Sequence, residues 1–376
     1  MKKLLFFGPT FYDQPLNDNL RKKYKYLSEI AKIYVVAFSE SRYKGEVDET
    51  SFMFYKKNKF RLLNYFKIYL ISYFQLPKLV NQFEIDVVAF QDPITSYFGI
   101  RKLKKQNKNI KIVLETHGDF INTLQLEKSL IFPKIYKQLF MKIAKYTINN
   151  ADVIRAVSSS TEAQARSFSS DKLIVRFPAW VDFEIFESIS NKREIHEKFK
   201  ILFIGSVTDR KKPHQIVEAI SHINEFDCEL AIVGPTPNLK YLNQLNKQIK
   251  KLNLENKVNI FGQQNLEEVL EHYKNSNLMI LPSVSEGLAR VIFESQATAC
   301  PVLVTDAPGM QDIVIDQQTG FIFESNNVKD MKSKIVSIYE NYHQASQIGL
   351  NAKDFILNNY SAENFKFSFK KLIDLV

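Results

Sequence analysis

The stretch PSVSEGLARVIFESQA places two glutamates, Glu286 and Glu294, eight positions apart in an otherwise apolar segment. The preceding LMILPS predicts a buried strand and ARVIFESQATA predicts a helix, so Glu286 lies in the connecting loop and Glu294 within the helix. At a rise of about 1.5 Å per residue, their carboxylates would be roughly 10 Å apart, too far for one metal ion. The spacing suits two hydroxylated groups joined by a diphosphate, because each carboxylate can accept hydrogen bonds from a pair of hydroxyls. The alternative is that Glu286 caps the helix and Glu294 is a surface residue.

Other polar residues follow predicted strands. Arg210, Lys211 and Lys212 crowd the start of a helix after the strand ILFIGSV, where cations oppose the helix dipole unless an anion binds beside them. A solvated charged turn explains the same residues without a ligand. His117 follows the strand KIVLET, where it either touches a ligand or serves a structural role. Neither G-x-G-x-x-G nor a P-loop occurs in the sequence.

Short apolar runs that alternate with amphipathic helical stretches position these residues. The runs read as buried parallel strands, which implies a doubly wound sheet, and the alternation pauses and then restarts. The predicted strands cover residues 4–8, 33–38, 85–90, 111–116, 153–157, 201–207, 228–234, 258–262, 278–283 and 301–306. The predicted helices include residues 20–32 and 132–146. Ligands of such sheets bind at the carboxyl ends of strands, so the sequence predicts a site in a cleft between two facing Rossmann-like domains.

These patterns give the predicted domain organisation. Residues 1–180 form an N-terminal Rossmann-like domain, 181–199 a linker, and 200–355 a second Rossmann-like domain that binds the ligand. The last segment, 356–376, is expected to be a C-terminal helix, for which crossing back to the N-terminal domain is one option.

Composition narrows the class of protein. The chain has 376 residues and a net charge of +10, of which residues 1–190 carry +11 (30 Lys and Arg, 19 Asp and Glu) and residues 191–376 carry −1. The whole excess is therefore N-terminal, which suggests that this half meets an anionic surface. Cys228 and Cys300 lie in apolar surroundings and read as reduced core residues. No window reaches the length of a membrane span, and MKKLLFFGPT reads as a first strand.

The segment LPSVSEGLARVIFESQATACPVLVTDAPGMQDIVIDQQTGFIF resembles the signature block of retaining GT-B glycosyltransferases of the family-4 type (glycosyl transferases group 1). FIGSVTDRKKP, IVGPTP and VNIFGQQNLEEVLEHYKNSNLMI resemble the segments that precede this block, and DVVAFQDP, THGDF and NNADVIRAVSSSTE resemble the N-terminal landmarks. The resemblance covers most of residues 85–325 and implies a GT-B architecture.

The resemblance also implies roles for single residues. Glu286 would hold hydroxyls of the donor sugar and His117 would approach the reacting centre, which makes these two the candidate catalytic residues. Glu294 would hold the ribose of the nucleotide. The remaining donor-binding candidates are Lys211, Arg210, Gly205, Gly287, Leu288 and Ala289. No D-x-D motif occurs, so the diphosphate would meet Arg210, Lys211 and helix N-termini, with no metal and no cofactor.

The sequence departs from the family pattern at four places. Ser206 stands where the family commonly has an arginine, and Arg210 is the candidate replacement. The usual Asn-Gly before Val-Asp is Ala179–Trp180, and an expected Gly-Gly is Gly309–Met310. The loop after the first strand lacks the family's paired glycines, which leaves the acceptor side undefined.

The expected function is transfer of a sugar from a nucleotide-diphosphate donor to an acceptor hydroxyl with retention, in cell-surface polysaccharide or lipid-linked glycan assembly. Alternatives are a GT-B-like epimerase or phosphorylase acting on related substrates, or a non-catalytic GT-B partner subunit. A nucleic-acid partner is not expected, because no recognition module is visible. The donor base, sugar, acceptor, linkage and oligomeric state stay open.

Two N-terminal stretches, 55–80 and 132–146, mix lysines with aromatic and aliphatic residues at helical spacing. This mixture is typical of interfacial helices, although core aromatics with solvated lysines would look the same. Many relatives extend lipid-linked saccharides at the cytosolic face of the membrane. We therefore expect a cytoplasmic protein that binds an anionic membrane surface peripherally through these two stretches.

Overall fold

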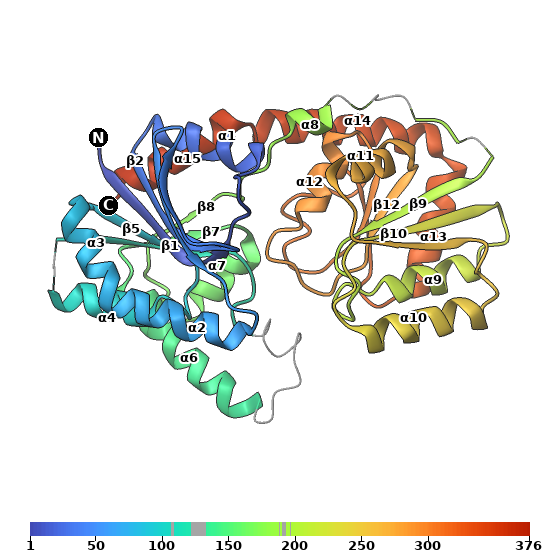
Figure 1. The fold of residues 1–376 in the computed structure, drawn as a ribbon. Helices are drawn as coiled ribbons and strands as arrows, with labels where there is room; N and C mark the ends of the chain where they lie inside the picture. Colours follow the sequence, from blue (N-terminus) through green and yellow to red (C-terminus); the bar gives the residue numbers. More distant parts are fainter. Residues whose placement is uncertain (107–108, 122–132, 188, 190–192, 196) are drawn as a thin grey trace. The chain divides into compact units, whose positions relative to one another are not determined.

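The computed structural model describes residues 1–376 except 107–108, 122–132, 188, 190–192 and 196 (Figure 1). The chain divides into two compact units. Unit 1 comprises Met1–Asp182 together with Ala362–Val376, and unit 2 comprises Phe183–Ser361. Among the described helices, none is long and apolar enough to cross a membrane.

Unit 1 is built on an eight-stranded sheet that is parallel except at one edge, where β3 and β4 form an antiparallel hairpin. In sheet order its strands are β3 (Tyr43–Val47), β4 (Thr50–Lys56), β2 (Lys32–Ser39), β1 (Lys3–Phe11), β5 (Val87–Phe90), β6 (Lys111–Thr116), β7 (Val153–Ala156) and β8 (Ile174–Arg176). Its helices are α1 (Asp18–Ser28), α2 (Arg61–Leu70), the π-helix η1 (Ile71–Gln75), α3 (Leu76–Phe83), α4 (Tyr97–Gln106), α6 (Pro133–Asn150), α7 (Ser159–Arg166) and α15 (Ala362–Asp374).

The two faces of this sheet bury separate apolar cores because successive side chains of a strand point to opposite faces. Leu5 and Phe7 of β1 pack in the core beneath α2, η1, α3, α4 and α6. Leu4 and Phe6 pack in the core beneath α1 and α15. Figure 1 shows α1 and α15 on one side of the sheet and α2, α3 and α4 on the other. The C-terminal helix α15 thus completes unit 1, with Phe369 of α15 5.6 Å from Phe6 between ring centroids.

Unit 2 is built on a six-stranded, fully parallel sheet. In sheet order its strands are β11 (Val258–Gly262), β10 (Cys228–Val233), β9 (Phe199–Ile204), β12 (Leu278–Leu281), β13 (Val302–Thr305) and β14 (Phe321–Phe323). Its helices are α8 (Glu184–Glu187), α9 (Pro213–Ser221), α10 (Leu239–Lys251), α11 (Leu266–Asn275), α12 (Arg290–Ala297), α13 (Val328–Glu340) and α14 (Tyr342–Asn359). In Figure 1, α9 and α10 lie on one side of this sheet and α11 and α12 on the other.

The strand order of unit 2 indicates where a ligand would bind. The chain proceeds outward from β9 to β10 and β11, then returns to place β12 on the opposite side of β9. The loops that follow β9 and β12 therefore run to opposite faces of the sheet and leave a crevice at their carboxyl ends, the usual ligand position in doubly wound folds. Gly205 begins the first of these loops, and Glu286 lies in the second.

The structure confirms the two Rossmann-like α/β units and corrects several element boundaries. The predicted helix 20–32 is α1, which starts at Asp18 after the capping residue Asn17 and ends at Ser28. The expected single helix over 356–376 is the end of α14 and then α15, which starts at Ala362. The β3–β4 hairpin and the three-residue strands β8 and β14 were not predicted.

Candidate functional site

Three charged side chains meet at the crevice of unit 2. Glu286, which is 8% exposed, forms ion pairs through Oε1 with Lys211 Nζ at 2.9 Å and with Arg210 Nη1 at 3.1 Å. The same Arg210 nitrogen donates to the Ser285 carbonyl at 2.7 Å, and the Val284 N–H donates to the Arg210 carbonyl at 3.2 Å. Ion pairs and hydrogen bonds to backbone carbonyls therefore connect the loops that follow β9 and β12. Two cations against one carboxylate leave an excess of positive charge, which suits an anionic ligand group.

Two glycines allow the close packing around the Lys211 side chain. Gly205 has φ +149°, and a Cβ there would lie 3.0 Å from Cδ of Lys211, so the lysine side chain crosses directly over it. Gly234, after β10, has φ +137°, and its Cβ would lie 2.2 Å from the Gly205 carbonyl oxygen. A side chain at Gly234 would therefore push the two strand ends apart.

The neighbouring Lys212 is directed elsewhere. It is the N-cap residue of α9 in the left-handed region, with φ +50°, and its ammonium donates to the Asn326 side chain. Of two adjacent lysines, only Lys211 thus joins the cluster with Glu286. That Arg210 replaces the family arginine missing at Ser206 stays a prediction.

Glu294 occupies a different environment on α12. Its side chain is 15% exposed, Oε2 accepts from the Tyr273 hydroxyl at 3.1 Å, and Oε1 lies 3.7 Å from Nη2 of Arg290. Burial raises the pKa of Glu294 above its ordinary value, and Arg290 and Tyr273 offset part of the rise.

The pKa of Glu286 is shifted in the opposite direction. Burial opposes its charge, but Lys211 and Arg210 outweigh that effect, so the pKa of Glu286 lies below its ordinary value. Two carboxylates eight residues apart are thus tuned in opposite directions. Such divergence is typical of groups with different tasks. Glu286 stays ionised and organises the two cations, whereas Glu294 is a partly desolvated acceptor.

Gly287, Leu288 and Ala289 lead from Glu286 into α12. Ala289 is the N-cap residue of α12, and no side chain caps this helix end. The residue itself is buried, at 2% exposure. The role of this segment in ligand contact stays a prediction.

In unit 1, His117 follows β6 and is held by a buried charge pair. Its Nε2 lies 3.1 Å from Oε2 of Glu115, and the other oxygen of Glu115 accepts from Arg155 Nη1 at 2.7 Å. Arg155 also donates to the Pro178 carbonyl at 2.8 Å, and its guanidinium lies 4.2 Å from the ring centroid of Phe177. Burial opposes the charge of Glu115, but Arg155 and His117 hold its pKa well below the usual range.

Two of the departures from the family pattern place a large apolar side chain in a buried position. Trp180 packs in the core of unit 1, 5.4 Å from Phe365 between ring centroids, and donates from its indole nitrogen to Asn19. Met310 is fully buried, at 0% exposure.

Cys228 and Cys300 are buried free thiols.

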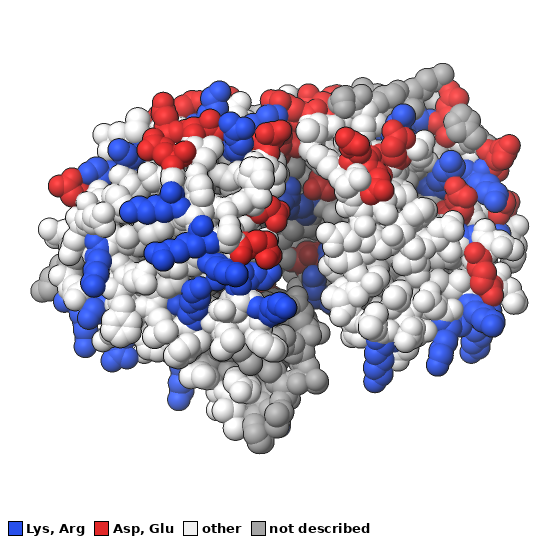
Figure 2. Space-filling model, viewed as in Figure 1, with Lys and Arg blue, Asp and Glu red and all other residues white. Residues whose placement is uncertain are grey.

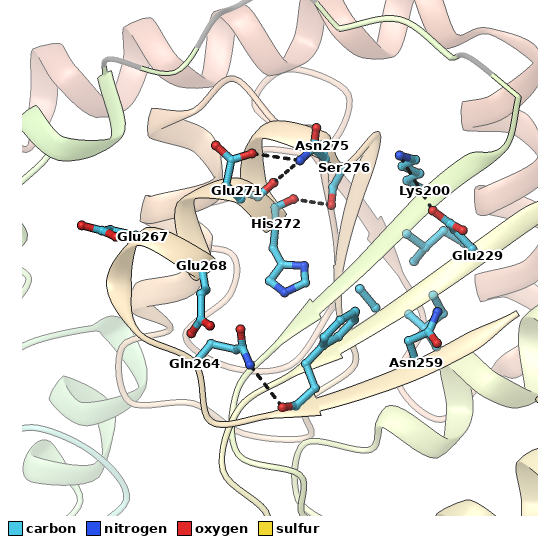
Figure 3. A pocket seen from close by; sticks show the side chains of 14 residues that line it. Lys200, Glu229, Asn259, Gln264, Glu267, Glu268, Glu271, His272, Asn275 and Ser276 are labelled. Atoms are coloured by element: carbon cyan, nitrogen blue, oxygen red, sulfur yellow. Dashed lines mark hydrogen bonds and ion pairs between the residues drawn. The ribbon is translucent and has the colours of Figure 1, made fainter.

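A separate groove of about 460 Å³ lies on unit 2 beside α11, as Figure 3 shows. Glu268, Glu271 and His272 line it together with Glu229 and Asn259 from the sheet. None of the predicted site residues is among its lining residues. We therefore place the candidate site at the charged crevice rather than at this groove.

Comparisons with known proteins identify the family of the chain. Residues 31–184 match the glycosyltransferase family 4 model, and residues 185–355 match the glycosyl transferases group 1 model. The chain belongs to the family-4 type of GT-B glycosyltransferases. An uncharacterized glycosyltransferase of Methanocaldococcus jannaschii is 24% identical over 371 residues, which is 93% of each chain.

The names of one further relative and of one solved structure mention substrates of those proteins. The UDP-Gal:alpha-D-GlcNAc-diphosphoundecaprenol alpha-1,3-galactosyltransferase of Escherichia coli is 25% identical over 81% of this chain and 79% of its own. The HepE protein of Anabaena, solved in complex with UDP-glucose, superposes with a TM-score of 0.73 at 15% identity over 100% of both chains. The superposition supports the GT-B fold of this chain.

The structure brings Glu286, Lys211, Arg210 and Gly205 together and adds residues that sequence reasoning missed. Glu115 and Arg155 hold His117, and Tyr273 holds Glu294. Arg155 stands 40 residues from Glu115, and Tyr273 stands 21 residues from Glu294. The one available signal was the charged pair inside the apolar strands KIVLET and VIRAV, where an ionised residue requires a partner.

Proposed function

We propose that this chain transfers a sugar from a nucleotide-diphosphate donor to an acceptor hydroxyl with retention of anomeric configuration. The observation that carries the proposal is the meeting of Glu286, Lys211 and Arg210 at the crevice after β9 and β12. Lys211 and Arg210 bind the diphosphate and stabilise the charge that develops on it as the sugar leaves. Glu286 accepts hydrogen bonds from sugar hydroxyls and Glu294 from the ribose.

We assign no general base to the transfer. The acceptor hydroxyl attacks the face of the sugar from which the diphosphate departs, and the departing diphosphate takes the acceptor proton. His117, oriented by Glu115, contacts the sugar or the acceptor near the reacting atoms. Because two cations already face the diphosphate, we propose that no divalent ion takes part. Full activity in EDTA is expected, and loss of activity restored by magnesium or manganese would contradict this point.

For substrates, the comparisons favour a uridine nucleotide and a lipid-linked glycan acceptor. The Anabaena protein was solved with UDP-glucose, and the Escherichia coli relative is named for a UDP-Gal donor and a diphosphoundecaprenol-linked acceptor. A binding screen of UDP-, GDP- and ADP-sugars tests the donor. Product analysis with polyprenyl-diphosphate saccharides then tests the acceptor. Failure to bind any of these nucleotides would favour the alternative of a non-catalytic partner.

We also propose that unit 1 binds an anionic membrane surface from the cytoplasmic side, in the assembly of cell-surface polysaccharide. Several apolar side chains of α2 and η1 are exposed, among them Phe66 at 61% and Phe74 at 60%. At the start of α6, Ile135 is 64% and Leu139 is 49% exposed. Lysines accompany them, and Figure 2 shows Lys and Arg side chains spread over the visible face of unit 1.

Not every aromatic side chain of the two stretches is available for the proposed membrane contact. Tyr65 and Tyr69 of α2 are half-buried, and Tyr69 donates to the Ile94 carbonyl at 3.4 Å, so these two aromatics belong to the unit itself. Residue 132 and the side chain of Arg61 lie outside the part that the structure describes. Within the stretch 55–80, three exposed lysines lie immediately before α2, namely Lys56, Lys57 and Lys59.

Liposome co-sedimentation tests this surface. Binding should require anionic lipid and fall with salt, because each basic residue near such a surface contributes about 1 kcal/mol. Neutralising Lys56, Lys57 and Lys59 together should release the protein. Neutralising three exposed lysines of α10 in unit 2, namely Lys247, Lys250 and Lys251, changes the net charge equally and should not. Equal recovery on neutral and anionic liposomes would refute the membrane proposal and leave the transferase proposal intact.

A further inference from the structure

A fully buried tyrosine links α11 to the second glutamate. The Tyr273 side chain is 0% exposed, and its hydroxyl lies 3.1 Å from Oε2 of Glu294 and 3.2 Å from the Val291 carbonyl oxygen. Both acceptors lie on α12, three residues apart. The single phenol thus spans a turn of the helix that carries Glu294.

The two faces of α11 contact different parts of unit 2. Glu271, His272 and Asn275 line the groove shown in Figure 3, whereas Tyr273 points into the unit. The carbonyl of Tyr273 accepts from Nη1 of Arg193 at 2.8 Å, and the same nitrogen donates to the Ser276 carbonyl at 2.6 Å. The end of α11 is therefore fixed at its backbone as well as at the phenol. A hydroxyl on such a support can hold a carboxylate in one rotamer.

We propose that Tyr273 is a positioning residue that fixes the Glu294 carboxylate and favours its ionised form for binding the nucleotide ribose. This inference rests on the proposed donor site. With Glu294 ionised, the phenol donates its proton to Oε2. With Glu294 protonated, the carboxyl donates to the phenol oxygen and the phenol proton turns to the Val291 carbonyl. Either state is accommodated, but only the ionised carboxylate can accept from both ribose hydroxyls.

The consequence for pH can be worked out from the groups that act on Glu294. Among the described residues, these are Arg290 of α12 and Tyr273 of α11. Both favour the charged carboxylate, against burial. Nucleotide affinity should fall as pH drops through the pKa of Glu294. Removing the phenol hydroxyl raises that pKa, so the fall should begin at a higher pH.

The test measures the affinity of the wild type and of Tyr273→Phe by calorimetry from pH 5 to pH 8. The probe is whichever of UDP, GDP and ADP the wild type binds most tightly. At neutral pH we expect binding roughly threefold to tenfold weaker in the variant, and a midpoint of the pH profile shifted upward. Tyr342→Phe is the matched control, because this phenol of unit 2 hydrogen-bonds Asn277 instead of Glu294. Its profile should superpose on the wild type and also reveals any titration of the nucleotide itself.

Further variants separate the outcomes. A monofluorinated tyrosine at position 273 is nearly isosteric and a stronger donor, so it should move the midpoint downward even if Tyr273→Phe folds poorly. Glu294→Ala tests the donor site beneath the inference. If Glu294→Ala binds nucleotide normally, the ribose assignment and this inference both fail. If Glu294→Ala loses affinity while the profiles of the two Tyr273 variants match the wild type, the positioning role alone is overturned.

Discussion

Replacing Glu286 with glutamine removes one negative charge from the cluster while keeping the size of the side chain. The carboxylate lies 2.9 Å from Lys211 and 3.1 Å from Arg210. At an effective dielectric of about 20, each pair has a gross attraction of about 5–6 kcal/mol, most of which desolvation offsets. Removing one partner of a buried pair costs about 3–5 kcal/mol. Lys211 and Arg210 are 12% and 23% exposed, so water relieves part of this cost. We expect a loss of about 2–3 kcal/mol in the unfolding free energy.

The functional effects of Glu286→Gln should separate binding from turnover. The two cations lose their internal partner, so a nucleoside diphosphate should bind as tightly as to the wild type or more tightly. The sugar loses its charged acceptor and the cations lose their fixed positions, so turnover should fall about 10²–10³-fold. Urea unfolding, calorimetric titration and a steady-state transfer assay measure the three quantities. Glu271→Gln, at a 62% exposed side chain, is the control and should change none of them.

The stabilising effect of the ionised Glu286 carboxylate should depend on pH. Because the pKa of Glu286 is depressed in the folded protein, its contribution to stability is present above the unfolded pKa, near 4.3, and disappears as pH falls through the folded pKa. The difference in unfolding free energy between wild type and Glu286→Gln should therefore be full at neutral pH and shrink below about pH 4. Turnover within about threefold of the wild type, or a stability difference that does not change with acid, would refute the reasoning.

Three further predictions follow from individual contacts. Lys211→Ala should weaken nucleotide binding by roughly tenfold or more, as expected for loss of a charged hydrogen bond, while Lys212→Ala changes it little; equal effects in calorimetry would contradict the assignment. Glu115→Gln should lower the unfolding free energy by about 3–5 kcal/mol, because it leaves the buried Arg155 without its carboxylate, and an unchanged urea midpoint would argue against this pair. Gly234→Ala should lower both the melting temperature and nucleotide affinity, since its Cβ would lie 2.2 Å from a carbonyl oxygen; a variant with wild-type values of both would show that the strand ends can separate freely.

Most strands could be predicted because parallel strands buried on both faces read as nearly continuous apolar runs. The β3–β4 hairpin could not, because its turn lacks the usual signal. Asp48 and Glu49 both have positive φ, at +47° and +65°, and Glu49 stands where such a two-residue turn normally places glycine. The short strands β8 and β14, with three residues each, are too brief to show a periodicity.

The sequence allowed us to predict which residues belong to the candidate site but not the contacts between them. The family resemblance implies separate roles, with Glu286 binding the sugar and Lys211 binding the diphosphate. In the structure these two side chains form a direct ion pair. That pairing depends on the position of β9 next to β12, which a local pattern does not contain. Tyr273 is likewise an ordinary core aromatic by periodicity, and its contact with Glu294 exists only after α11 packs beside α12.

The most direct test of the proposed function follows sugar from donor to acceptor. The protein is incubated with a nucleotide sugar that it binds and with a polyprenyl-diphosphate saccharide. Mass spectrometry then measures the acceptor, and proton NMR gives the anomeric configuration of the new linkage. We predict an acceptor heavier by one glycosyl residue, nucleoside diphosphate released in equal amount, and the anomeric configuration of the donor retained. Release of nucleoside diphosphate without a glycosylated acceptor, an epimerised donor, or an inverted linkage would contradict the proposal.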